Sequence, residues 1–450
     1  MMIRHVRLEN IVLKTLFFLA LTTSLSAIEP TTLTTAPQPD TQKSPEASTS
    51  PQLEPIEKIK APIPTKMVGS KQEIHVGCSL PLTGEVSILS NQVFDGMTLF
   101  FNKILKEAPE LTFSCALKVL DDANQIPKLN TNVTTMLKES PLLISPYGTD
   151  ALSSLMPRIT SQQALVLFPL EGSTAFRKPE FSNLIFFRAS FAQEIQALID
   201  YTVQTLGKKK IALFYEASEW GEGVLEDTKQ ALKIHNLTLM GAASYPQNSL
   251  NITQGAEALV QKAPNAILCI AGARPAYNFI RHIINKGLHQ TVFLGLTSLI
   301  SIQSTLAKSR GVNIIASSVV PDPINSTTKI AQEYRADMKK YFSNKPLTPF
   351  SLEGYINAAL LVEVLKLTKF PLTTEKIVEI FTHLKHVKFK DLELKFNPST
   401  RSLCNAVWLN LGDGKDWVLA KEAKANGSRV PERPQDDKGL TKSTDKQEST

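Results

Sequence analysis

Polar residues that could hold a small anion follow a short apolar run near the middle of the chain. The run 165–168 is soon followed by Gly172, Ser173 and Thr174. Glycine lets the backbone approach a ligand closely, while hydroxyls and free amides donate hydrogen bonds to carboxylates and phosphates. Glu171 lies in the same loop and would repel a bound carboxylate. The loop predicts a binding cradle in which Glu171 either recruits an ammonium, a guanidinium or an amide, or points outward as a solvated charge.

Residues suited to binding also follow other apolar runs. Thr149 and Asp150 could cap the next helix, and the Thr149 hydroxyl could instead bind a ligand carboxylate. Trp220 lies at a strand-to-helix turn, either as a core side chain or as the apolar wall of a cleft. Thr297 ends a further run, and Arg274 is either a cleft cation or a solvated surface charge. Their common position at strand ends indicates one binding site.

The elements that must position these residues are short strands separated by helices. Apolar runs predict nine strands, at 74–80, 113–120, 142–144, 165–168, 184–187, 211–215, 266–271, 292–296 and 314–320. Apolar residues at helical spacing fall between them and near the end of the chain. Strands without alternation, separated by amphipathic helices, predict an α/β fold with parallel sheets covered on both faces. Nine strands exceed one modest sheet, so we expect two doubly wound lobes with ligands beyond the carboxyl ends of the strands.

The two ends of the chain differ from this regular middle. Arg4 and Arg7 precede a short apolar run and small residues, which predicts a signal peptide over 1–27. We therefore expect a periplasmic or exported protein, with an uncleaved membrane anchor as the alternative. Segment 28–72 is rich in Pro, Thr and Ser and predicts a disordered spacer, and 424–450 predicts a disordered tail.

Charge and motifs exclude several classes of function. The net charge of +7 is spread along the chain without a dense basic block, so no nucleic-acid binding is expected. The sequence has no G-x-S-x-G elbow, no Walker A motif and no complete G-x-G-x-x-G. We therefore expect no catalytic residues, no cofactor and no metal, and not an enzyme.

The cysteines are consistent with an exported protein. The chain has four, at Cys78, Cys115, Cys269 and Cys404, and none has C-x-x-C spacing. Cys78 and Cys115 fall on consecutive predicted strands, which a parallel sheet could place side by side. A disulfide between these two is one prediction, and a pairing of Cys269 with Cys404 is another.

The order and spacing of these segments resemble the periplasmic solute-binding proteins of the branched-chain amino acid (leucine/isoleucine/valine) type. The resemblance covers about residues 73–420 and rests on GCSLPLTGEV, PYGTDA, PLEGSTAFRKP, FFRASFAQE, IALFYEASEWGEG and SLEGYINAALLVEVL. It implies the type I periplasmic binding protein fold, with two Rossmann-like lobes joined by a three-crossover hinge. Lobe 1 would comprise 73–190 plus 322–400, and lobe 2 would comprise 191–321 plus 401–420.

The resemblance also implies roles for individual residues. Thr149 and the loop 172–174 would hold the carboxylate of an amino-acid ligand, and Trp220 would stack over that ligand. The sequence departs from the family at two other positions, because Leu89 replaces a tyrosine and Thr297 stands where an acid is frequent.

Glu171 is a third departure, since relatives usually have threonine or a small residue at its place. An amino-acid ligand therefore does not follow from the resemblance alone. We expect a monomeric solute-binding protein that captures a small polar ligand by lobe closure and delivers it to an ABC permease in the membrane. A sensory protein of the same fold, and a structural derivative with a cleft that no longer binds, remain as alternatives.

Overall fold

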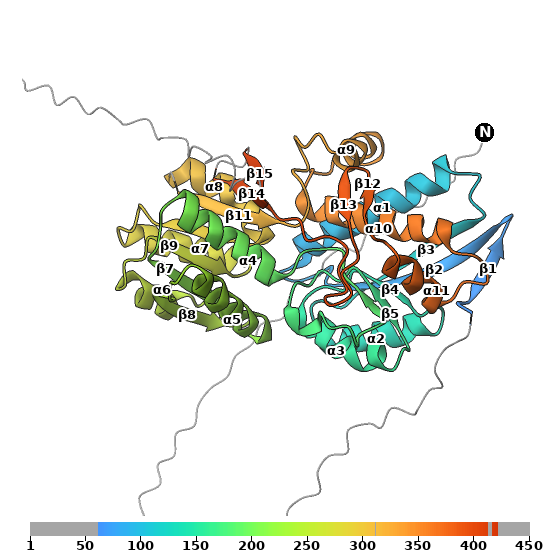
Figure 1. Cartoon of the computed structure of the whole chain (residues 1–450), viewed down its shortest axis with the longest axis horizontal. Coiled ribbons are helices and arrows are strands. Elements are labelled where there is room, and N and C mark those ends of the chain that lie inside the picture. Colours follow the sequence, from blue (N-terminus) through green and yellow to red (C-terminus); the bar gives the residue numbers. More distant parts are fainter. Residues whose placement is uncertain (1–61, 311, 413–415, 422–450) are drawn as a thin grey trace, which may run out of the picture. The chain divides into compact units, whose positions relative to one another are not determined.

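The computed structural model describes residues 62–310, 312–412 and 416–421. The predicted signal peptide, the predicted tail and most of the predicted spacer lie outside these residues. No helix in the described part of the chain is long and apolar enough to cross a membrane. The described chain forms two α/β lobes, each built on a mainly parallel sheet (Figure 1), which confirms the predicted fold class.

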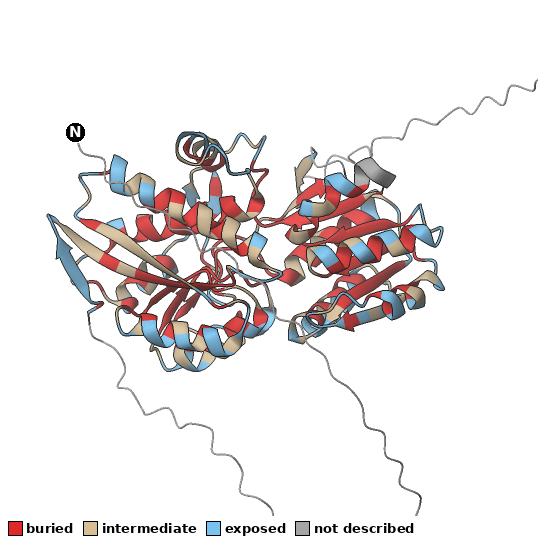
Figure 2. Ribbon diagram, turned by 180° about the vertical axis from the view of Figure 1, so that it is seen from behind, coloured by how far each residue is buried: buried red, intermediate tan, exposed pale blue. Residues whose placement is uncertain are grey.

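The sheet of lobe 1 has six strands: β1 (Thr65–Val68), β2 (Lys71–Leu80), β3 (Phe113–Asp121), β4 (Leu142–Ile144), β5 (Leu165–Leu167) and β6 (Leu184–Ile185). The order β3-β2-β4-β5-β6 is parallel throughout, and β1 pairs antiparallel with β2. Residues 65–72, which the sequence placed in the spacer, therefore form β1 and the start of β2. All four side chains of β1 are exposed, so hydropathy gave no signal for this strand (Figure 2).

Helices cover both faces of this sheet. One face packs on α1 (Ser87–Glu107) and α10 (Pro349–Leu367), and the other on α2 (Ile126–Leu137) and α3 (Thr149–Thr160). Gly96 on α1 lies so close to α10 that a Cβ there would be 1.9 Å from the Ser351 carbonyl oxygen. The lobe is completed by α9 (Lys329–Tyr341), α11 (Thr374–Thr382) and the hairpin of β12 (Val387–Phe389) and β13 (Leu392–Leu394).

The sheet of lobe 2 repeats the same strand order. Its parallel strands run β8 (Gly241–Pro246), β7 (Ile211–Ala217), β9 (Ala266–Ile270), β10 (Val292–Gly295) and β11 (Ile314–Ser318). Antiparallel β14 (Trp408–Leu411) and β15 (Trp417–Leu419) extend it beyond β11. Its helices are α4 (Phe191–Asp200), α5 (Glu219–Ile234), α6 (Thr253–Val260), α7 (Ala273–Asn285) and α8 (Ile300–Arg310).

The strands of lobe 2 are apolar on both sides because each side meets a different layer of helices. On β7, Leu213 packs in the cluster that contains α4 and α5, while Phe214 packs in the cluster that contains α6 and α7. Figure 2 shows the central strands of both sheets buried between partly exposed helices. This arrangement explains why the strands read as continuous apolar runs rather than as alternating ones.

The chain passes between the two sheets three times, at 186–190, 319–328 and 395–407. The first and third crossovers are hydrogen-bonded to each other. The Phe186 amide donates to the Arg401 carbonyl, and the Leu403 amide donates to the Phe186 carbonyl, both at 2.9 Å. The hinge therefore contains a paired ribbon rather than three independent segments.

Both predicted disulfides are wrong, because all four cysteines are free thiols. In the pairing of β2 with β3, Cys115 lies opposite Ile74, whereas Cys78 lies opposite Val119. The two cysteines are thus four residues out of register, about 13 Å along the strands. A disulfide needs Cα atoms within about 7 Å, so neighbouring strands are not a sufficient condition for a bridge.

Candidate functional site

The predicted site residues follow the carboxyl ends of the central strands in both lobes. In lobe 1 the strand order reverses between β2 and β4, and in lobe 2 it reverses between β7 and β9. Such reversal points leave a crevice beyond the carboxyl ends of parallel strands, where ligands of α/β proteins bind. We therefore consider the loops that follow β2, β4, β5, β7, β9 and β10 as the candidate binding loops.

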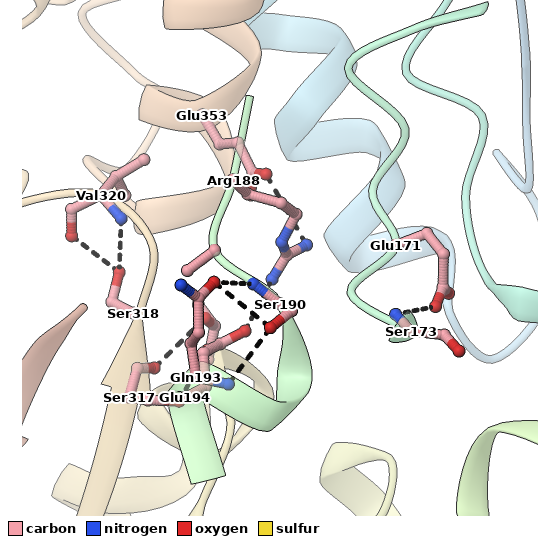
Figure 3. Close-up of polar contacts among 12 residues, drawn as sticks. Glu171, Ser173, Arg188, Ser190, Gln193, Glu194, Ser317, Ser318, Val320 and Glu353 are labelled. Atoms are coloured by element: carbon pink, nitrogen blue, oxygen red, sulfur yellow. Dashed lines mark hydrogen bonds and ion pairs between the residues drawn. The ribbon is translucent and has the colours of Figure 1, made fainter. Parts of the chain in front are cut away.

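Glu171 is held inside its own loop. The Thr149 hydroxyl donates a hydrogen bond to Glu171 Oε2 at 2.9 Å, and the Ser173 backbone amide donates to Oε1 at 2.6 Å (the second bond is drawn in Figure 3). Only 1% of Glu171 is exposed, and Thr149 is also buried. The interpretation of Glu171 as an outward, solvated charge is therefore wrong, because its carboxylate occupies the donors of the cradle.

Burial and hydrogen bonding act on Glu171 in opposite directions. Burial raises the pKa of the carboxyl, while the Ser173 amide, the Thr149 hydroxyl and the nearby Arg188 and Arg177 charges lower it. On balance the pKa of Glu171 is raised, so the two donors and two guanidinium groups offset only part of the effect of burial.

Gly172 brings the same loop against the first helix of lobe 2. Its carbonyl accepts a hydrogen bond from the Phe191 amide at 2.7 Å, and a Cβ at this position would lie 2.5 Å from the Phe191 ring. The Phe191 ring centre is 6.2 Å from that of Trp220, which is half-buried at the start of α5. Trp220 Nε1 has no hydrogen-bond partner among the described residues. Only glycine fits position 172, and the contact connects the cradle to the aromatic side chains of lobe 2.

A buried ionic network crosses the hinge beside this loop. Arg188 on the first crossover pairs with Glu194 of α4 at 3.4 Å and with Glu353 of α10 at 3.6 Å. The Ser317 hydroxyl on β11 donates to Glu194 at 2.7 Å. Figure 3 shows the Arg188 side chain between Glu353 and Glu194. One guanidinium therefore connects a carboxylate of each lobe.

No role was predicted for these three charged residues, although they lie in FFRASFAQE and SLEGYINAALLVEVL. They could have been recognised in the sequence as charged residues inside otherwise apolar stretches. Burial raises the pKa of Glu194 and of Glu353, and the Arg188 charge opposes that rise. The Arg188 charge therefore offsets part of the cost of burying two carboxyl groups.

Arg177 binds backbone carbonyls of the first crossover. Its Nη1 donates to the Arg188 carbonyl at 3.0 Å, and its Nη2 donates to the Ala189 carbonyl at 3.2 Å and to the Glu171 carbonyl at 3.4 Å. Burial lowers the pKa of Arg177 to about 9. This guanidinium holds backbone carbonyls in place.

Two polar contacts connect the loops of lobe 1 with those of lobe 2. Arg274 pairs with Glu85 at 3.3 Å, and Gln247 donates to Asp150 at 2.9 Å. The side chains of Arg274 and Glu85 are 67% and 53% exposed, so Arg274 is a paired surface cation. Asp150 likewise contacts the other lobe and does not cap α3.

The remaining predicted residues lie nearby in different roles. Ser173 caps the short helix Thr174–Phe176 by accepting from the Ala175 amide at 3.2 Å, and Thr174 is exposed. Thr297 is buried and donates to the Ser317 carbonyl at 3.2 Å, which ties the loop after β10 to the end of β11. Leu89 is half-buried on α1.

Two further residues at strand ends were missed from the sequence. Glu216 ends β7 and accepts a hydrogen bond from the Tyr245 hydroxyl at 3.1 Å. Burial raises the pKa of Glu216, and the charges of Asp150 and Glu85 raise it further. Tyr147 follows β4, and burial together with the charges of Glu171 and Glu216 raises its pKa to about 12. Carboxylates of both lobes therefore lie close enough to influence one another.

Two lobes with one strand order, three crossovers between them and polar loops at the strand ends define a hinged, two-lobed α/β protein. The chain matches the model of the periplasmic binding protein family over residues 73–405, and it belongs to this family. The predicted resemblance is thereby confirmed. Members of the family and the solved relatives are substrate-binding proteins.

Several similar proteins are described as being of the branched-chain amino acid type. The Leu/Ile/Val-binding protein homolog 7 of Brucella abortus (strain 2308) is 24% identical over 165 residues, which are 36% of this chain and 41% of that protein. A possible leucine/isoleucine/valine-binding protein from Rhodopirellula baltica SH 1 superposes with a TM-score of 0.71 at 22% identity, covering 80% of this chain and 99% of that chain.

A branched chain amino acid ABC transporter from Thermus thermophilus, solved with bound valine, superposes with a TM-score of 0.66 at 17% identity. That superposition covers 78% of this chain and 96% of the other. At these identities the structural similarity establishes the fold.

Proposed function

We propose that this chain is an exported solute-binding protein that captures a small polar ligand by closing its two lobes and delivers it to an ABC transporter in the membrane. The observation that carries the proposal is the hinge, in which three crossovers join two lobes with candidate binding loops at their strand ends. The Thermus thermophilus relative, which is an ABC transporter component with bound valine, supports a transport role.

The contacts between the loops are suited to reversible closure. The Arg274–Glu85 pair is exposed on both sides, and exposed pairs of this kind contribute about 0–1 kcal/mol. The Asp150–Gln247 bond is exposed as well. Since such contacts are weak, the closed form gains its stability mainly from a ligand that touches both lobes.

Binding is tested on the full chain with a library of amino acids, amides, polyamines and short peptides. A ligand should raise the melting temperature and reduce the radius of gyration in small-angle scattering. Trp220→Ala should weaken binding without loss of fold, because the half-buried ring lies at the start of α5 beside Phe191.

The matched control is Trp417→Ala, since Trp417 is a half-buried tryptophan on β15, away from the candidate loops. It should leave the affinity unchanged. If no compound changes either the melting temperature or the radius of gyration, the chain is not a solute receptor.

A further inference from the structure

We propose that Glu171 takes the place of a ligand carboxylate, and that the cleft binds small organic cations without a carboxylate group, namely amines and guanidines. The inference rests on the proposed solute-binding function and names the ligand class of that same site. Three observations carry it: the occupied donors, the charge of the binding loops, and the aromatic side chains beside them.

The donors that could receive a ligand anion in lobe 1 are already used. The Thr149 hydroxyl lies at the start of α3, and the Ser173 amide lies in the loop after β5. A helix N-terminus favours an anion. The anion found there is the Glu171 side chain, which binds one donor with each oxygen, at 2.9 Å and 2.6 Å. A second carboxylate would meet a like charge and no free donor from this pair.

The six candidate loops carry an excess of negative charge. Segments 81–86, 145–150, 168–174, 216–222, 271–275 and 296–298 contain six carboxylates and one cation: Glu85, Asp150, Glu171, Glu216, Glu219, Glu222 and Arg274. Arg274 is paired with Glu85. The buried Arg188 pairs with Glu194 and Glu353, and Arg177 donates to three carbonyls. Each of these three arginines already has partners within the protein. The loops contain no further cation that could balance the remaining carboxylates.

Glu216 and the aromatic residues suit a cation with an apolar stem. The Glu216 carboxylate accepts hydrogen bonds from the side chains of Tyr245 and Ser218, and a carboxylate can accept several. Trp220 and Phe191 lie near the starts of α5 and α4 with their ring centres 6.2 Å apart, and Tyr147 follows β4. Aromatic faces attract ammonium and guanidinium groups and pack well against methylene chains. An amine or guanidine would therefore find both a counter-charge and an apolar wall.

The test uses pairs of compounds that differ only by the carboxylate: agmatine and arginine, cadaverine and lysine, isoamylamine and leucine. The full chain is unfolded in urea and refolded to remove any ligand carried from its host, and each compound is titrated by calorimetry. At least one amine should bind, and about tenfold or more tightly than its amino-acid partner, which corresponds to about 1.4 kcal/mol.

Three variants separate the role of Glu171 from general effects of charge. Glu171→Thr frees the Thr149 hydroxyl and the Ser173 amide, so affinity for the amino acid should rise and the preference for the amine should shrink. Glu171→Gln keeps the size of the side chain and removes its charge. If circular dichroism shows that the threonine variant does not fold, the glutamine variant is used for the test instead. Glu110→Gln is the control, because Glu110 is an exposed acid in the turn before β3, outside the candidate loops, and it should leave the preference unchanged.

The possible results distinguish this inference from the proposed function. An amino acid that binds as tightly as its amine partner, or tighter, overturns the ligand class and leaves the solute-binding function standing. Binding of only a neutral compound from the library does the same. If neither the pairs nor the library produce heat or a change in melting temperature, the solute-binding function itself fails.

Discussion

Replacement of Arg188 by methionine tests how the hinge network stabilises the fold. The substitution keeps an unbranched apolar stem and removes the charge that Glu194 and Glu353 share. All three side chains are buried, and Glu194 and Glu353 come from different lobes. Without Arg188, two carboxyl groups remain in a dry environment, and the Ser317 hydroxyl still donates to Glu194.

The expected cost is large compared with the stability of a folded protein. Removing one partner of a buried ion pair typically costs about 3–5 kcal/mol, because the remaining charge has lost both its water and its partner. Whole domains are stable by about 5–15 kcal/mol. We therefore expect the Arg188→Met variant to fold at low temperature with a much lower urea midpoint.

The matched control is Arg274→Met, which removes the same side chain from the exposed pair with Glu85. An exposed pair contributes about 0–1 kcal/mol, so this variant should unfold close to the parent. Urea unfolding is followed by circular dichroism for the three proteins at pH 7. Equal unfolding free energies for the two variants, or a loss below about 1 kcal/mol for Arg188→Met, would refute the reasoning.

The pH dependence provides a second readout for the same variant. Burial raises the pKa of Glu194 and Glu353, and loss of Arg188 raises both further. A carboxyl with a raised pKa holds its proton more tightly in the folded state than in the unfolded state, where the pKa is about 4.3. Stability is then lost as the pH rises through the folded-state pKa. The deficit of Arg188→Met should therefore be smallest near pH 4 and grow toward pH 7.

Two further predictions concern the core. Gly96→Ala should lower the stability by about 1–3 kcal/mol in thermal melts, because its Cβ would lie 1.9 Å from the Ser351 carbonyl oxygen. The control Gly223→Ala on α5, with no atom within 4 Å of the Cβ, should be neutral or stabilising. Similar losses for both variants would contradict the close approach of α1 and α10. Burial raises the pKa of Cys115 to about 12 and raises that of Cys78 as well. Iodoacetamide at pH 8 without reductant should therefore label all four cysteines only after the protein is unfolded, as counted by mass spectrometry. A pair that stays unlabelled until a reductant is added would establish a disulfide.

The parallel strands could be predicted from the sequence because they are buried on both faces. The run 142–144 coincides with β4, and the run 165–168 differs from β5 by one residue. The edge strand β8 (Gly241–Pro246) was missed because its side chains alternate between partly buried and exposed. The exposed strand β1 was missed because it lies in a proline-rich segment and its pairing depends on the backbone alone.

The candidate site could be predicted only in outline. The loops follow from strand ends, so Thr149 and Glu171 were both expected in the site. Their contact was not, since it joins residues 22 positions apart through the packing of two loops. The same holds for Arg188 and Glu353, which meet across 165 positions of sequence (353 − 188). Local patterns locate polar groups on elements, whereas their partners are set by tertiary packing.

The interleaving of the two lobes along the chain has a consequence for biosynthesis. The parallel strands of lobe 2 lie within one continuous segment, Ile211–Ala217 to Ile314–Ser318. Lobe 1 is split, because α1 packs on α10, more than 240 residues later. During translation the parallel core of lobe 2 is complete while the apolar face of α1, with Met97 and Phe100, still lacks its cover. That apolar face therefore stays uncovered on the growing chain until α10 has been made.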